Sequence, residues 1–186
     1  MQSVGRGAEQ DVAPLRVAFA RCASHLRRGP RWAAFMASRC PFPPASYGWD
    51  EPLGAVLPEA QPYFIKPGNS ILWPPTNGFQ RWVQRLLTHG IDTLILGGCT
   101  LNSCVRVSAC DISERFGRAG LQVVVDLSLC GARLSNYRPS GEFYGRSSVE
   151  AAIEQMRAAG VEVTETCGDS NATASDLQRA ATGQGK

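Results

Sequence analysis

The stretch DTLILGGCTLNSCVRVSA, at residues 92–109, decides the fold of this 186-residue chain. Its first part is a short apolar run that ends in two glycines, and its second part predicts a helix beginning near Ser103. A buried strand that enters a glycine turn and then a helix is typical of a parallel α/β sheet. The pattern places Cys104 in the first helical turn, at the sheet edge where open α/β sheets bind their ligands.

The predicted helix start gives Cys104 a favourable environment for ionisation. Unpaired N–H groups and the positive end of the helix dipole stabilise a thiolate, so we predict a lowered pKa for this thiol. The same N–H groups can receive the oxyanion of a tetrahedral intermediate. Cys104 is therefore predicted to be the most nucleophilic of the seven cysteines. The alternative interpretation is a small packing residue at the start of a helix.

The rest of the chain alternates between predicted strands and helices. Strands are expected at residues 32–37, 63–66, 92–98, 121–127 and 161–166, and helices at residues 12–28, 79–89, 103–118 and 147–160. The strands are nearly continuous apolar runs, which favours a mostly parallel, Rossmann-like sheet with helices on both faces. We predict one three-layer α/β/α domain over residues 12–167, with flexible tails at 1–11 and 168–186.

The composition excludes several classes of partner. The net charge is only +3, and the arginines are scattered, so nothing indicates a nucleic acid or an anionic membrane surface. No apolar run approaches the roughly 20 residues that span a bilayer, and the N-terminus lacks the apolar centre of a signal peptide. The expected location is the cytoplasm.

The cysteines and histidines indicate neither a disulfide framework nor a metal centre. The seven cysteines are odd in number, irregularly spaced and without a CxxC pair. The two histidines, His25 and His89, lie far apart in the sequence. We therefore expect reduced thiols, no metal and no cofactor.

Three motifs together resemble a known family. Gly98 is followed six positions later by Cys104 and Val105, the next predicted strand ends in VVVD (123–126), and Lys66 follows a short strand upstream. This set resembles the isochorismatase-like cysteine hydrolases. The resemblance covers residues 60–167 well and residues 12–40 only loosely.

The resemblance implies a fold and a chemistry. The fold would be that of the isochorismatase-like hydrolases, and a Cys–Lys–Asp triad would cleave a small amide or related acyl substrate without a metal. Cys104 would form a thioester, Lys66 would help to keep it ionised, and the N–H groups of Thr100 and Cys104 would form the oxyanion hole. The family commonly has a cis peptide between the positions of Cys99 and Thr100. Its members often form homo-oligomers.

The chain departs from the family at the N-terminus. The resemblance implies a strand ending in an Ile-Asp-x-Gln pattern before the first helix, and no such segment occurs here. Asp11 is the only carboxylate of the right kind in that region, and it lacks an apolar strand in front of it. We take Asp11 as a candidate base, whose loss lowers rates by about 10²–10⁴.

Two alternatives to an active hydrolase stay open. One is a catalytically impaired or truncated relative that binds a small ligand or acts as an oligomerisation protein. The other is a Rossmann-type nucleotide binder, which is disfavoured because GGCTLNSC lacks the third glycine of GxGxxG. The identity of the substrate depends on the predicted loops at residues 40–62 and 67–76.

Overall fold

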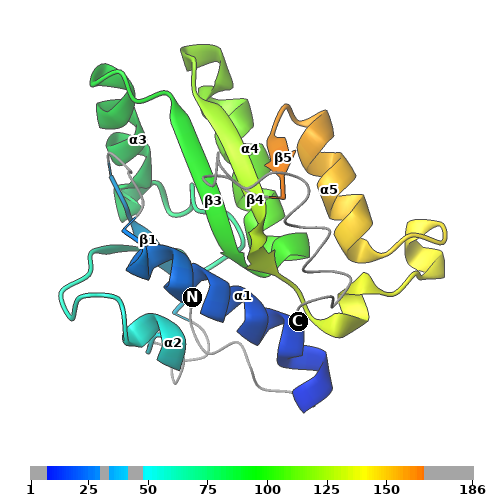
Figure 1. Ribbon diagram of the computed structural model, residues 1–186. Helices are drawn as coiled ribbons and strands as arrows, with labels where there is room; N and C mark the ends of the chain where they lie inside the picture. Colours follow the sequence, from blue (N-terminus) through cyan, green and yellow to red (C-terminus); the bar gives the residue numbers. More distant parts are fainter. Residues whose placement is uncertain (1–7, 30–33, 42–47, 166–186) are drawn as a thin grey trace, which may run out of the picture.

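The computed structural model describes residues 8–29, 34–41 and 48–165, and it shows parallel strands alternating with helices (Figure 1). The helices are α1 (Glu9–Arg27), α2 (Glu51–Gly54), α3 (Phe79–Thr88), α4 (Arg106–Phe116) and α5 (Ser148–Ala158). The strands are β1 (Ala37–Arg39), β2 (Tyr63–Ile65), β3 (Thr93–Cys99), β4 (Gln122–Gly131) and β5 (Glu162–Thr164). Every pairing between these strands is parallel.

Helices cover both faces of the strands. On one face, α1 and α2 form an apolar cluster around Leu15 and Phe19, to which Leu129 of β4 contributes. On the other face, α3, α4 and α5 form a larger cluster that includes Ile112 and Met156. Figure 1 shows α1 in front of the central strands and α4 behind them. The predicted three-layer α/β/α architecture is confirmed.

The described strands form two separate sheets. β1 pairs with β2, and β3, β4 and β5 pair in that order. The Asp92 carbonyl accepts a hydrogen bond from the Gln122 amide at the start of β4 at 2.7 Å, so Asp92 faces β4. Backbone groups alternate between the two edges of a strand, and those of Thr93 and Ile95 therefore face the edge of β3 away from β4. No described strand pairs with that edge.

Element boundaries differ from the predictions at three places. α1 begins at Glu9, so residues 9–11, which we expected in a tail, belong to the helix. A strand was expected at 32–37, whereas β1 begins at Ala37. Residues 32 and 33 of the expected range lie outside the described part of the chain. β4 continues to Gly131, four residues beyond the predicted end at 127. The remaining tail residues, 1–7 and 168–186, also lie outside the described ranges.

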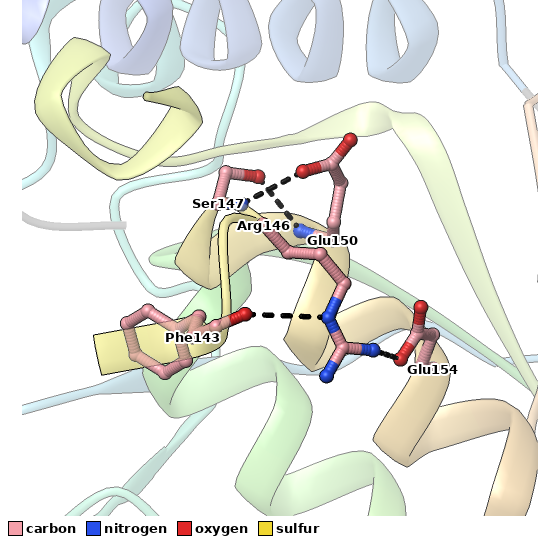
Figure 2. Close-up of polar contacts among 5 residues, drawn as sticks. All are labelled: Phe143, Arg146, Ser147, Glu150 and Glu154. Carbon is pink, nitrogen blue, oxygen red and sulfur yellow. Dashed lines mark hydrogen bonds and ion pairs between the residues drawn. The ribbon is translucent and has the colours of Figure 1, made fainter. Parts of the chain in front are cut away.

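Local hydrogen bonds explain where α5 begins. Ser147 precedes the helix, its hydroxyl accepts a bond from the Glu150 amide at 3.1 Å, and its own amide donates to the Glu150 carboxylate at 2.7 Å. Figure 2 shows this capping box beside an ion pair between Arg146 and Glu154. Such a cap stabilises a helix by about 0.5–2 kcal/mol. Across the described residues, no helix combines the length and apolarity needed to cross a membrane.

Candidate active site

Three parallel strands end at one place, and their ends bring Cys40, Lys66 and Cys104 together. Cys40 follows β1, Lys66 follows β2, and Cys104 lies just after β3. The Lys66 ammonium donates a hydrogen bond to Cys40 Sγ at 3.6 Å and another to the Cys104 sulfur. The carboxyl ends of β1, β2 and β3 therefore share one edge, where the topology of parallel sheets predicts a site.

The backbone before Cys104 requires glycine. Gly98 has a φ of 139°, a conformation that side-chain-bearing residues rarely adopt. The following Cys99–Thr100 peptide bond is cis, as the resemblance implied. A π-helical turn over Leu101–Val105 then precedes α4, so the helical segment starts two residues before the predicted Ser103. Cys104 remains in the first helical turns, as predicted.

The loop after β2 fixes the Lys66 side chain. Lys66 is only 7% exposed, and its ammonium donates to the carbonyls of Gly68 at 2.9 Å and Asn69 at 3.3 Å. The buried Ser108 hydroxyl of α4 donates to the same Asn69 carbonyl at 3.0 Å and accepts a bond from the Ile71 amide at 3.1 Å. Ser108 thus fastens the loop to the helix that carries Cys104.

The surroundings of Cys104 favour its ionised form. A hydrogen bond from the Cys40 thiol, the charge and hydrogen bond of Lys66, and the Thr100 amide together lower its pKa from 9.0 to about 5, against the opposing effect of burial. Its sulfur also lies 3.3 Å from Asn69 Oδ1. At neutral pH Cys104 is therefore a thiolate beside a lysine ammonium.

The other described cysteines are shifted the opposite way. Burial raises the pKa of Cys22 to about 12, that of Cys99 to about 12, and those of Cys110 and Cys130 above the ordinary value. Cys104 is therefore the most readily ionised of the described thiols, and the thiolate is the reactive form of cysteine.

A cavity of about 570 Å³ extends from Cys104 and Lys66 between β1 and β3. Ala37 and Ser38 line it from β1, and the whole of β3 from Thr93 to Cys99 lines it from the other sheet. Among the described residues, no Asp or Glu lines the cavity. No group of three or more His, Cys, Asp or Glu side chains among the described residues is arranged to hold a metal.

Comparison with solved structures gives several matches. An isochorismatase-like hydrolase from Alkaliphilus metalliredigens is 17% identical, and the match covers 87% of this chain and 84% of that chain with a TM-score of 0.57. YcaC from Pseudomonas aeruginosa, determined with hexane-2,5-diol and covalent acrylamide, is 18% identical, with 85% and 66% coverage and a TM-score of 0.52. YcaC from Escherichia coli, described as an octameric hydrolase of unknown specificity, is 19% identical, with 94% and 76% coverage and a TM-score of 0.52.

This chain has the isochorismatase-like hydrolase fold. At these identities the likeness concerns the fold, and this chain spans 66% of the length of the P. aeruginosa protein. No protein-family model matches the sequence, and no curated protein matches it.

Asp11 does not join the site that this isochorismatase-like fold builds. It lies in the first turn of α1, where its carboxylate accepts bonds from the Ser135 amide at 2.9 Å and from the Arg133 guanidinium at 3.2 Å. These contacts lower the pKa of Asp11, and the hydrogen bond from the Ser135 amide contributes most. Asp11 does not line the cavity. The structure thus places the Asp11 carboxylate against Arg133 and Ser135, apart from Cys104 and Lys66, and gives no support to its expected role as the base.

Two residues at the site of this isochorismatase-like fold were not predicted from the sequence. Cys40 received no role from the sequence, yet its sulfur accepts a hydrogen bond from Lys66 and its side chain lowers the pKa of Cys104. Asn69 belongs to the loop that we expected to bear on specificity, and its side chain lies against the Cys104 sulfur. Cys40 directly follows the observed β1, whereas the predicted strand ended at residue 37 and Cys40 fell in a predicted loop, so no usable signal for it was present in the sequence.

Proposed function

We propose that this protein is a metal-independent cysteine hydrolase that cleaves a small amide or related acyl substrate through a thioester on Cys104. The observation that carries the proposal is the contact of Cys104 with the buried Lys66 ammonium at the end of the cavity. A thiolate in a half-buried site beside a fixed cation is poised to attack a carbonyl carbon. The covalent acrylamide in the P. aeruginosa relative supports a nucleophile in proteins of this fold.

The first half of the proposed reaction forms the thioester. The Cys104 sulfur attacks the carbonyl carbon, and the backbone N–H groups of Thr100 and Cys104 receive the negative oxygen. The carbon–nitrogen bond then breaks, and the leaving amine takes a proton from the Lys66 ammonium. Because Cys104 is already ionised, this half needs no separate base to activate the nucleophile.

The second half returns the enzyme to its starting state. Lys66, now a neutral amine, takes a proton from water as that water attacks the thioester carbon. The acid product leaves, and Cys104 departs as a thiolate beside the restored ammonium. Lys66 thus serves as acid and then as base, which balances the protons in a cavity without a lining carboxylate.

A second candidate function follows from the residues that line the cavity. Within the described part of the chain, no Asp or Glu lines the cavity, which favours a catalytically impaired relative that binds a small ligand or acts as an oligomerisation protein. A homo-oligomer fits both candidates and is supported by the octameric E. coli relative. A cytoplasmic location, which keeps thiols reduced, fits both as well.

Acyl transfer to the protein tests the proposal. With p-nitrophenyl acetate as an activated acyl substrate, mass spectrometry should find one acetyl group on Cys104, and p-nitrophenol should continue to be released afterwards. Cys104→Ala should abolish both, whereas Cys110→Ala should abolish neither. Acetylation without further turnover would favour the impaired relative. Acetylation spread over other thiols would contradict the role of Cys104.

A further inference from the structure

A second thiol lies directly against the nucleophile. The Cys40 thiol donates a hydrogen bond to the Cys104 sulfur, and both side chains line the same cavity. The Lys66 ammonium lies 3.6 Å from Cys40 Sγ and also donates to Cys104. Two thiols that line one cavity beside the same buried ammonium are more than hydrolysis requires.

We propose that Cys104 and Cys40 form a peroxide-reactive dithiol, in which peroxide oxidises Cys104 and Cys40 then closes a Cys40–Cys104 disulfide. The proposal shares the Cys104 thiolate with the hydrolase function, but it requires no substrate and no turnover. It assigns a modification site to this cavity, and the oxidant is hydrogen peroxide or an organic hydroperoxide.

The first step oxidises Cys104 by two electrons. The thiolate sulfur attacks one oxygen of the peroxide, the oxygen–oxygen bond breaks, and Cys104 becomes a sulfenic acid. The departing hydroxide takes a proton and leaves as water. The Lys66 ammonium lies where that proton is needed.

The second step joins the two sulfurs. Cys40 attacks the Cys104 sulfur, the sulfur–oxygen bond breaks, and the hydroxide leaves as water with the Cys40 proton. In sum, two thiols and one peroxide give one disulfide and two waters. A small external dithiol restores both thiols by exchange.

The change of charge at Cys104 prepares Cys40 for this step. In the reduced site the pKa of Cys40 is raised, first because its thiol is hydrogen-bonded to the Cys104 sulfur and then by burial, while the Lys66 charge opposes both. Once Cys104 is a neutral sulfenic acid, Cys40 no longer donates to a thiolate. The Lys66 amine, which gave up its proton in the first step and lies 3.6 Å from Cys40 Sγ, can then take the Cys40 proton and pass it to the departing hydroxide. Oxidation of one sulfur therefore activates the other.

Peptide mapping after peroxide treatment tests the proposal on the unmodified chain. Reduced protein at pH 7 is given one equivalent of hydrogen peroxide, its thiols are alkylated, and it is digested without reductant. We expect a Cys40–Cys104 cross-link with the loss of two hydrogens as the main product, reversed by dithiothreitol. Oxygenated Cys104 without any cross-link, or a cross-link between other cysteines, would overturn the proposal.

Two variants separate the roles of the thiols. Cys40→Ser should leave Cys104 to accumulate one and then two or more oxygens, about tenfold faster than in the parent chain, because no thiol captures the sulfenic acid. Cys110→Ser, the matched control, should form the Cys40–Cys104 cross-link at the parental rate. Equal oxygenation of Cys104 in the parent and in Cys40→Ser would contradict the proposal. Since neither result depends on hydrolysis, loss of the hydrolase proposal leaves this test intact.

Discussion

At the scale of single residues, the site depends on the buried ammonium group of Lys66, which lies beside the sulfurs of two cysteines. Lys66 is 7% exposed, and the ion pairs found among the described residues do not include it. Its ammonium donates to two loop carbonyls and to the sulfurs of Cys40 and Cys104. A buried charge needs such partners, because burial without them costs several kcal/mol. The thiolate and the ammonium therefore stabilise each other.

Replacing Lys66 tests this mutual stabilisation. In Lys66→Gln the Cys104 thiolate loses a charge and a hydrogen-bond donor, so its pKa should rise from about 5 toward the ordinary 9.0. Each unit by which the pKa exceeds 7 lowers the thiolate fraction at pH 7 about tenfold. Acrylamide alkylation of Cys104 at pH 7 should slow accordingly. Arg85→Gln removes an exposed charge and serves as the control, and equal rates in both variants would contradict the role of Lys66.

Replacing Cys40 tests its hydrogen bond to the nucleophile. Cys40→Ala removes the donor that contributes most to the lowered pKa of Cys104, so the inflection of alkylation rate with pH should move upward from about 5. Cys40→Ser keeps a donor at the same position and should restore most of the shift. If alanine and serine give the same inflection as the parent chain, the hydrogen bond has no part in ionising Cys104.

At the scale of elements, α1 packs directly on the end of β4. A side chain at Gly131 would place its Cβ 2.8 Å from Ala18 Cβ and 2.9 Å from the Pro14 carbonyl. Only glycine allows this approach, which holds α1 over the strand beside the site. The contact makes α1 part of the core, although sequence analysis placed the first residues of this helix in a tail.

Gly131→Ala should destabilise the fold by forcing α1 away from β4. The expected loss is about 1–3 kcal/mol in the free energy of unfolding, as for other overpacked sites. Gly141→Ala is the matched control, since a Cβ there meets nothing within 4 Å. Urea unfolding followed by circular dichroism measures both. A Gly131→Ala protein as stable as the control would show that α1 does not press on β4.

The elements also show how far the sequence could predict the structure. Apolar runs and glycine turns located β2, β3, α3 and α5 within about two residues, because these signals are local. The separation of β1 from β3 could not be predicted, since strand pairing depends on contacts between distant segments. Cys104 and Lys66 were found through local motifs. Cys40 was missed because its role appears only where three strand ends meet.

At the scale of the whole molecule, the two sheets leave a cavity and an open strand edge. The backbone groups of Thr93 and Ile95 face that edge, and no described strand pairs with it. Unpaired strand edges commonly pair with other chains or are covered by them. Here that edge lines the cavity between β1 and β3, so association of copies of this chain stays a prediction.

Light scattering during gel filtration tests the association. A homo-oligomer should elute with a mass that is a multiple of 20.0 kDa. Dilution should lower this mass toward that of the monomer only if the subunits associate weakly. A constant mass of 20.0 kDa at all concentrations would contradict the expected homo-oligomer.

The pH dependence of cysteine alkylation tests the central claim, that Cys104 is a thiolate at neutral pH. Iodoacetamide is applied in brief pulses from pH 4 to pH 10, and mass spectrometry follows each cysteine separately. The rate at Cys104 should rise through an inflection near 5 and be level by pH 7, while the rates at Cys22 and Cys99 stay low until far higher pH. A Cys104 rate that rises only above pH 8, together with the other thiols, would contradict the account.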